Sequence, residues 1–287
     1  MAPIGRKPVG AMLGVLPFFA YTTIFLGIPT LIVIVGAFLD GNGHPTLGNL
    51  SALTQPQIVA AFVPSTVLSA VTAVLGAVFG ALLAYAVSTA HEGGLLRRLI
   101  TSLCGVLAQF GGVTLAFAFI ATFSIQGFLT LWVKKFGIDL ASTTWLYDWD
   151  KGLMLVYTYF QIPLMLIVFL PAVEGLRPQW REAAESLGGS TWHYWRHVAG
   201  PILAPSFIGA MLLLFTNAFS AYATAMALIS QGSPLISQQI GNTLSSEVIL
   251  GQENIGKAMA LGMVAIVAVV MTLYVVLERR TTKWLGS

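Results

Sequence analysis

The sequence has few charged residues. Only 9% of its 287 residues are Asp, Glu, Lys or Arg, whereas 56% are hydrophobic. Soluble domains contain about a quarter charged residues, so this composition excludes an ordinary soluble domain. Uncharged runs of roughly 20 residues recur along the chain, and each could cross a hydrocarbon layer about 30 Å thick. The sequence therefore predicts an all-α, multi-pass membrane protein.

The sequence also lacks the motifs of common catalytic and metal sites. It contains no G-x-x-x-x-G-K-[ST] phosphate loop, no H-E-x-x-H and no candidate triad. Its single cysteine, Cys104, excludes an intrachain disulfide and is expected to be a packing residue. His193 and His197 are four residues apart, but no third ligand is evident. We expect no enzymatic activity, no cofactor and no metal in this chain.

Charge is missing from the middle of the apolar runs as well. All 25 charged residues lie in predicted loops or at the ends of predicted spans. Carriers driven by ion gradients often place ionisable residues or broken helices in the middle of the membrane. Their absence argues against a secondary transporter, which stays the alternative, and more strongly against an intramembrane enzyme. The net charge of +3 indicates no nucleic-acid partner, because the basic residues collect at span ends.

The uncharged runs predict six transmembrane helices in one domain, residues 1–287. Lysine and arginine, which favour cytoplasmic loops, set the orientation. With both termini in the cytoplasm, ten basic residues lie inside, and Lys134, Lys135, Lys151 and Lys257 lie outside. The ten are Arg6, Lys7, Arg97, Arg98, Arg177, Arg181, Arg196, Arg279, Arg280 and Lys283. The expected spans are 11–39, 62–89, 99–124, 152–173, 201–229 and 257–277, with a cytoplasmic loop at 174–200.

The loop between the fourth and fifth spans is unusually polar: RPQWREAAESLGGSTWHYWRHVAGPILAPS, residues 177–206. Pro178 suits the first turn of a helix, where a missing N–H costs nothing. The glycine pair 188–189 should end that helix. Thr191 could then cap a second short helix that runs as far as Pro201. The sequence thus predicts two short helices joined by a glycine turn.

The first of these helices has one apolar face. Counted from its first member, the others follow after three, four and seven positions, which places all of them on one side of a helix. They are Trp180, Ala183, Ala184 and Leu187. Such a face could dock into a groove of another protein, with the large side chains as anchors. It could equally lie on lipid headgroups. The spacing alone favours neither alternative.

This loop resembles the EAA loop of permease subunits of binding-protein-dependent ABC importers. That pattern reads E-A-A, three residues, G, nine residues, I-x-L-P. Here Glu182, Ala183, Ala184 and Gly188 match, and after nine residues come Val198, Ala199, Gly200 and Pro201. Val198 replaces the isoleucine and Gly200 the leucine. The resemblance implies a six-helix type I importer permease in the bacterial cytoplasmic (inner) membrane.

The resemblance also implies a mechanism and partners. The first loop helix would be the coupling helix, seated in a cleft of a separate ATPase subunit that binds ATP and magnesium. Expected partners are a second permease subunit, homologous or identical, two ATPase subunits, an extracytoplasmic substrate-binding protein and membrane lipid. The residues implied in ATPase coupling are Trp180, Glu182, Ala183, Ala184, Leu187 and Gly188. We expect Glu182 to bond basic or backbone donors nearby.

A solute path through these helices would have to use uncharged polar side chains. The candidates lie in predicted spans three, four and five: Gln109, Tyr159, Gln161, Asn217, Ser220 and Tyr222. The same residues could instead make hydrogen bonds between helices, as small polar residues do in any membrane bundle. Residues 215–240 and 254–264 look similar to permeases for polyamines, and related phosphonate and ferric-iron permeases share this character. A polyamine is the expected solute on that resemblance, with phosphonate or ferric iron as alternatives.

Overall fold

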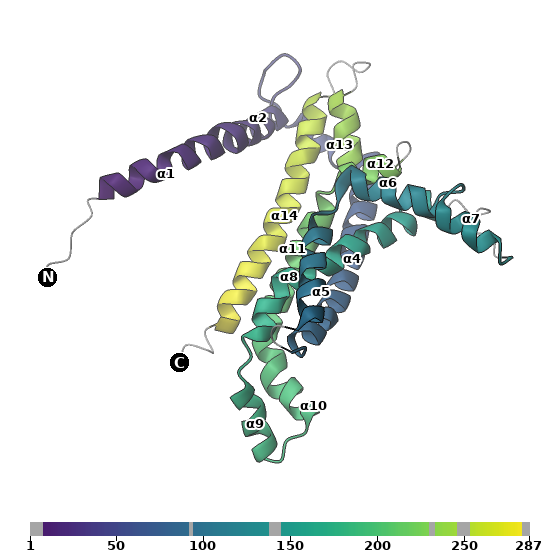
Figure 1. Ribbon diagram of the computed structural model, residues 1–287. Helices are drawn as coiled ribbons and strands as arrows, with labels where there is room; N and C mark the ends of the chain where they lie inside the picture. Colours follow the sequence, from purple (N-terminus) through teal and green to yellow (C-terminus); the bar gives the residue numbers. More distant parts are fainter. Residues whose placement is uncertain (1–7, 92–93, 138–144, 230–232, 246–252, 283–287) are drawn as a thin grey trace. The chain divides into compact units, whose positions relative to one another are not determined.

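The computed structural model describes residues 8–91, 94–137, 145–229, 233–245 and 253–282, and these are almost entirely helical (Figure 1). The first helices are α1 Pro8–Thr22, a π-helical turn Thr23–Gly27, α2 Ile28–Ala37, α3 Gly48–Ala52 and α4 Pro56–Ser88. The middle of the chain forms α5 Leu95–Gln109, α6 Gly112–Phe123, α7 Phe128–Lys134, a 3₁₀ turn Trp145–Tyr147 and α8 Gly152–Glu174. Then come α9 Pro178–Ser186, α10 Thr191–Tyr194, a π-helical turn Trp195–Ala199, α11 Gly200–Phe219, α12 Ala223–Leu228, α13 Ile236–Ser245 and α14 Glu253–Thr282.

Six helical segments of the described chain are long and apolar enough to cross a membrane. They are Val15–Ala37, Pro56–Ser88, Gly112–Lys134, Gly152–Glu174, Thr191–Phe219 and Asn254–Val276. The number agrees with the sequence prediction, and five of the six overlap a predicted span over most of its length. The third segment, Gly112–Lys134, overlaps only the second half of the predicted span 99–124.

The described chain divides into two compact units. Unit 1 consists of Met1–Val59 with Ile240–Ala265, and unit 2 of Ala60–Gln239 with Ile266–Ser287. The expectation of a single domain over 1–287 stays a prediction. Three of the basic residues used for the orientation, Arg6, Lys7 and Lys283, lie outside the described residues.

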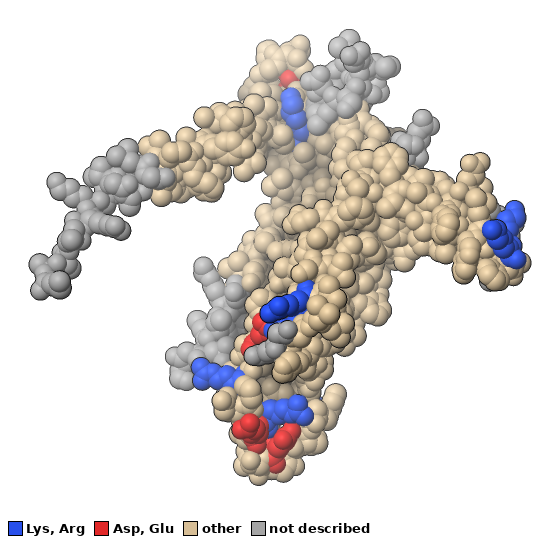
Figure 2. Space-filling view, viewed as in Figure 1, with Lys and Arg blue, Asp and Glu red and all other residues tan. Residues whose placement is uncertain are grey.

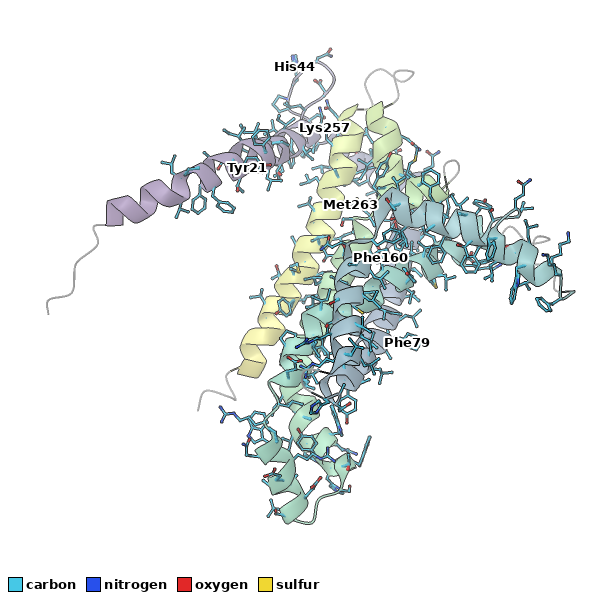
Figure 3. The ribbon with its side chains drawn as sticks, viewed as in Figure 1. Tyr21, His44, Phe79, Phe160, Lys257 and Met263 are labelled. Carbon is cyan, nitrogen blue, oxygen red and sulfur yellow. The ribbon has the colours of Figure 1, made fainter. Side chains whose placement is uncertain are left out.

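In unit 1, polar side chains join the end of α2 to the start of α14 (Figure 3). Lys257 donates a 2.8 Å hydrogen bond to Asn254 Oδ1, and the Asn254 amide donates to the Asp40 carbonyl at 3.0 Å. The Lys257 stem lies so close to Gly36 that a Cβ there would fall 2.4 Å from Lys257 Cδ. The sequence predicts Lys257 outside the membrane. In the structure its ammonium group bonds an amide oxygen in the first turn of α14.

The core of unit 2 depends on a close approach of α4 and α8. A Cβ at Gly80 would lie 2.4 Å from Met165 Cβ, and one at Gly76 would lie 2.6 Å from Gln161 Cβ. These glycines therefore permit helix contact, which is the role that small residues have in membrane bundles. The same bundle contains a cluster of buried side chains from α4, α6, α8 and α12 that includes Leu68, Leu115, Tyr157 and Leu228.

The predicted continuous helix over 99–124 is wrong. The structure ends α5 at Gln109 and begins α6 at Gly112. Gly111 is extended, and Gly112 has a φ of 65°, a left-handed conformation that costs a glycine little. The run contains no charged residue, but the glycine pair breaks the helix within it.

The fifth predicted span, 201–229, also needs correction. At its end the helix stops at Phe219, and α12 starts only at Ala223. The Ser220 hydroxyl donates to the Thr216 carbonyl at 2.9 Å, so a side chain competes with the backbone for the acceptor in the last turn.

At the other end of this span, the sequence predicts that the second loop helix ends at Pro201, and this prediction is wrong. The helical segment runs from Thr191 through a π-helical turn into α11 without a break. Proline lacks the N–H that an α-helix needs and crowds the preceding turn. The wide turn at Trp195–Ala199 ends just before Pro201, consistent with the helix accommodating this ring by local widening.

Candidate functional site

The polar loop between α8 and α11 forms a helical hairpin at one end of unit 2 (Figure 1). Pro178 is the first residue of α9, as the sequence predicts, and Arg177 precedes it in an extended conformation. No residue of α9 is buried. A helix with this many polar residues and no buried position gains little from packing within its own chain. Its surfaces are available to a partner.

The turn of the hairpin depends on two glycines that have different tasks. Gly188 has a φ of 77°, so it ends α9 in the left-handed region where other residues are strained. Gly189 is needed for space, because a Cβ would lie 2.8 Å from the Ala184 carbonyl oxygen. The cap of α10 is Ser190, whose hydroxyl accepts from the His193 N–H, and the predicted cap Thr191 is wrong by one residue.

An open groove of about 580 Å³ lies between α9 and the following helix. Trp180, Ala183, Ala184 and Leu187 all line it, so they share one face as their spacing predicts. Leu187 is 89% exposed at the edge of this groove. The opposite wall was not predicted from the sequence, and it comes from Gly189, His193, His197, Val198 and Ile202. A partner's side chain would have two apolar walls to contact, not a single flat face.

The carboxylates of α9 differ in their pairing. Glu185 accepts a hydrogen bond from Arg181 Nε at 3.0 Å, and this contact raises the pKa of Arg181. Glu182 is exposed, and its carboxylate has no hydrogen bond or ion pair within the described chain. The expected bond from Glu182 to nearby donors is therefore not formed inside this subunit. Glu182 is free to meet a donor on another protein.

The two histidines of the groove stack on one another. Their ring centroids are 5.9 Å apart and their planes differ by 17°. Each Nδ1 has a local contact, to the Ser190 hydroxyl at 2.9 Å for His193 and to the His193 carbonyl at 3.2 Å for His197. The residues that the structure describes include no group of three metal-ligating side chains. The histidines therefore serve here as a flat wall of the groove.

An ion pair joins α5 to α8 just before the start of the hairpin. Arg97, near the start of α5, forms an ion pair with Glu174 at the end of α8. In Figure 2, charged atoms gather on this part of unit 2 and on the hairpin. The pair is hard to predict from the sequence, because 77 residues separate its members. Basic and acidic residues at two neighbouring span ends are its signal in the sequence.

The two helix breaks of unit 2 lie next to each other. A Cβ at Gly112 would come within 3.8 Å of Ala223 Cβ, so the start of α6 faces the start of α12. The hydroxyl of Tyr157 donates to the Ala221 carbonyl at 2.8 Å and thereby holds the second break against α8. Unbroken helices are predicted over 99–124 and 201–229, and the two breaks show that this prediction is wrong. Interrupted helices leave backbone groups without partners, which suits a site that meets a solute.

Five of the six predicted path residues are on the surface of this subunit, and four of them flank the breaks. Gln109 ends α5, Asn217 is in the last turn of α11, and Ser220 and Tyr222 are at the second break. Tyr159 is 39% exposed and packs edge-on against Phe119, with ring centroids 5.5 Å apart.

Gln161, the sixth predicted path residue, is fully buried between α8 and α4. A solute cannot reach Gln161 in this conformation, so the placement supports the packing alternative for that residue.

A stretch that resembles a phosphate loop is not one. Residues 251–257 read GQENIGK, but Ala258 stands where the motif requires Ser or Thr. Residues 253–258 are already helical within α14, and Lys257 bonds Asn254 instead of pointing into an open loop.

The family model that matches this chain is described as binding-protein-dependent transport system inner membrane component and covers residues 76–283. Among curated relatives, the sulfate transport system permease protein CysT of Escherichia coli is 30% identical over 172 residues, 59% of this chain and 58% of that protein. The match thus spans less than two thirds of CysT. The spermidine/putrescine transport system permease protein PotB of Haemophilus influenzae is 22% identical over 263 residues, 89% of this chain and 90% of that protein.

Solved structures agree with this match at the level of the fold. A bacterial ABC transporter involved in the import of the acidic polysaccharide alginate contains a chain with a TM-score of 0.75 and 18% identity, and 95% of each chain is covered. The MetNI methionine ABC transporter gives a TM-score of 0.57 at 15% identity, over 78% of this chain and 95% of that one. The predicted fold of six membrane helices is confirmed.

Proposed function

Because the chain belongs to the family of inner membrane components of binding-protein-dependent transport systems, we propose that it is the permease subunit of an ATP-driven importer. It is a multi-pass inner membrane protein, as its six apolar helices and its family indicate. In the proposed role, the helix breaks of unit 2 contribute to a solute path. The α9 hairpin transmits the movement of a separate ATPase to that path.

The groove beneath α9 is the observation that carries this proposal. Ala183, Ala184 and Val198 of the EAA pattern line it, beside Trp180 and Leu187. The same short helix carries the unpaired carboxylate of Glu182. A rigid helix can contact a partner through large side chains, here Trp180 and Leu187, and through one charge, here Glu182. Movement of the partner would then shift the helix and switch the permease between two conformations. The hairpin is short and ends in a fixed glycine turn, so a push on α9 would reach both α8 and α11.

The proposed partners follow from this role. Two ATPase subunits would bind ATP and magnesium, and this chain would hold neither. A second permease subunit, identical or homologous, would complete the path, because several predicted path residues are exposed on the single subunit. An extracytoplasmic binding protein would deliver the solute. The alginate transporter was solved in complex with a periplasmic protein that carries an alginate pentasaccharide, which supports this arrangement by analogy of fold.

Uptake into membrane vesicles tests the energy source. With the assembled transporter, uptake should require ATP inside and continue after a protonophore collapses the proton gradient. A secondary transporter would behave in the opposite way, with uptake that follows the gradient and needs no ATP. The Glu182→Lys variant is the matched control, because it should abolish ATP-driven uptake and leave the chain in the membrane.

For the solute, we propose a small oxyanion of the sulfate class. The similarity to CysT supports this choice. The chemistry of the breaks also fits, since a polyamine would favour carboxylates and the predicted path residues carry none. The start of α6 at the break offers N–H groups, which favour anions. A polyamine remains the second candidate because PotB matches over more of the chain.

Competition in the same vesicles decides between the two. Uptake of radiolabelled sulfate should be inhibited by unlabelled sulfate and be indifferent to spermidine. Uptake of labelled spermidine, unaffected by sulfate, would overturn the oxyanion proposal and leave the ATP-driven mechanism in place.

A further inference from the structure

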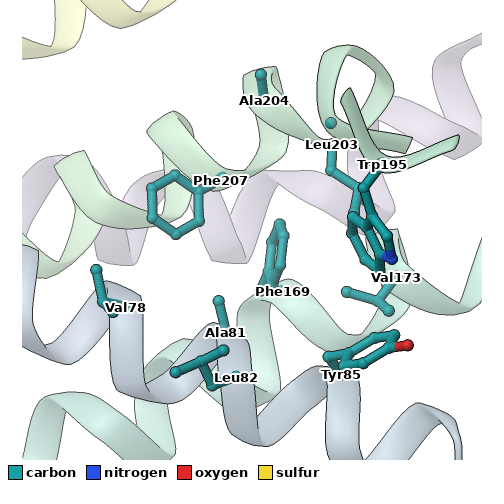
Figure 4. Close-up of a pocket in the computed structure, with 11 residues that line it drawn as sticks. Val78, Ala81, Leu82, Tyr85, Phe169, Val173, Trp195, Leu203, Ala204 and Phe207 are labelled. Carbon is teal, nitrogen blue, oxygen red and sulfur yellow. The ribbon is translucent and has the colours of Figure 1, made fainter. Parts of the chain in front are cut away.

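An apolar groove of about 580 Å³ lies on unit 2 between α4, α8 and the first turns of α11 (Figure 4). Phe169 and Phe207 project into it from α8 and α11. On the α4 side, Val78 and Leu82 are 44% and 61% exposed, so the groove is open. Its size and its hydrophobic walls suit a flexible hydrocarbon chain.

A second, polar pocket of about 440 Å³ continues from one end of this groove. The two share Tyr85, Val173 and Trp195 in their walls. Tyr85 and Trp195 meet edge to face, with ring centroids 5.1 Å apart, where the apolar part gives way to the polar part. Aromatic residues with one polar end are typical of the boundary between hydrocarbon and headgroups. The combined cavity is apolar at one end and polar at the other.

The polar pocket carries an excess of positive charge. Arg97, Arg177 and Arg181 line it, and Glu174 is the carboxylate among its lining residues. Arg97 is neutralised by Glu174, and Arg181 by Glu185. Arg177 forms no ion pair with any carboxylate that the structure describes, and its guanidinium lies 5.9 Å from the centre of the Trp180 ring. Arg177 is exposed, so its guanidinium is available to an anion from outside the chain.

We propose that the groove and the polar pocket together bind one anionic phospholipid of the cytoplasmic leaflet. An acyl chain would lie along Phe169 and Phe207, and the phosphate would meet Arg177. Basic pockets between membrane helices on the cytoplasmic side bind anionic headgroups in this way. The proposal uses the inward orientation of the hairpin and is independent of the solute. The bound lipid would connect the end of α8 and the start of α9, the point at which the hairpin meets the membrane.

Native mass spectrometry of the full-length chain in detergent tests the headgroup. The probes are dioleoyl phosphatidylglycerol and, as the uncharged control, dioleoyl phosphatidylcholine. The wild type should retain phosphatidylglycerol in preference. Arg177→Gln should lower the retained fraction about fivefold, the effect of one arginine near an anionic surface. Arg177→Lys should keep most of it, because the positive charge remains.

A matched variant distinguishes binding at this site from a general effect of positive charge on the hairpin. Arg196 is exposed on the same hairpin but lines neither cavity. Arg196→Gln should therefore leave retention unchanged. Equal retention of the two lipids by the wild type, or equal loss in both glutamine variants, would overturn the proposal.

The apolar half of the site is tested by filling it. Ala204 lines the groove, so Ala204→Phe should reduce phosphatidylglycerol retention. Ala60→Phe, at an exposed position of α4 outside the groove, should not. A photoreactive residue placed at position 82 in the assembled transporter should give adducts of phospholipid mass. Adducts with a polypeptide would show that a protein subunit covers the groove, and the lipid proposal would fail.

Discussion

The amide of Gln161 donates a 2.7 Å hydrogen bond to the Thr72 hydroxyl, and this bond joins α8 to α4 in the interior of unit 2. Both side chains are fully buried. Thr72 in turn donates to the Leu68 carbonyl at 2.8 Å, so its hydroxyl both accepts and donates a hydrogen bond. Gln161, placed in a path by its polarity alone, is thus a link between two packed helices.

The first prediction concerns this link. Thr72→Val removes the acceptor and keeps the shape, so the folded chain should lose about 0.5–2 kcal/mol, the range found for hydrogen bonds between membrane helices. Gln161→Leu alone should cost a similar amount. The double variant should cost less than the sum, because neither partner is left unpaired. Thermal unfolding of the detergent-solubilised chain measures all three, and strictly additive losses would contradict the link.

The close contact of α4 and α8 leads to the second prediction. Gly80→Val places side-chain atoms where Met165 and the Ile162 carbonyl already lie. The helices would have to separate, at a cost of about 1–3 kcal/mol or more, so the variant should unfold at lower temperature. Gly105→Ala is the control, since nothing lies within 4 Å of its Cβ position and alanine favours a helix. Its unfolding temperature should be unchanged or higher.

The third prediction distinguishes the two carboxylates of α9. Glu182→Gln should weaken binding of the ATPase subunits about tenfold, because truncating one member of an interfacial charge pair leaves the other unpaired. Glu185→Gln breaks only an exposed pair with Arg181, worth about 0.3–0.5 kcal/mol, and should leave binding intact. Co-purification and ATP hydrolysis of the reconstituted assembly measure both. If the two variants behaved alike, Glu182 would have no special role.

The fourth prediction concerns the turn of the hairpin. Gly188→Ala forces a side chain into a left-handed conformation, which costs about 1–2 kcal/mol, and should reduce coupled transport. Gly188→Asn should retain more transport, because asparagine enters that region more readily. The Cβ position meets nothing within 4 Å, so neither variant is disfavoured by a clash at Cβ, and backbone strain is the main difference expected. Transport rates per assembled complex give the comparison.

The fifth prediction tests the helix break as a solute path. Asn217→Leu should raise the KM for uptake about tenfold if the amide bonds an anionic solute, since hydrogen bonds to charged groups contribute about 1.5–3 kcal/mol. Assembly with the ATPase should be unaffected. A lower unfolding temperature with an unchanged KM would instead identify Asn217 as a packing residue.

The membrane class, the number of spans and the position of the hairpin could all be predicted from the sequence. Each of these depends on local information: a low share of charged residues, long uncharged runs, and a proline and a glycine at the two ends of α9. The shared face of Trp180, Ala183, Ala184 and Leu187 follows from helical periodicity in the same way. Local patterns of this kind persist in any tertiary arrangement, which is why they could be read in advance.

The roles of the polar side chains inside the spans depend on how the helices pack, and they could not be predicted from the sequence. Gln161 and Asn217 look alike in the sequence, yet one is sealed between α4 and α8 and the other is exposed beside a helix break. The breaks themselves escaped prediction because an apolar run does not show whether its backbone stays helical. Gly112 and Ala223, 111 positions apart, come together only when α6 packs on α12. Contacts across such distances depend on packing of whole helices, which local sequence patterns do not encode.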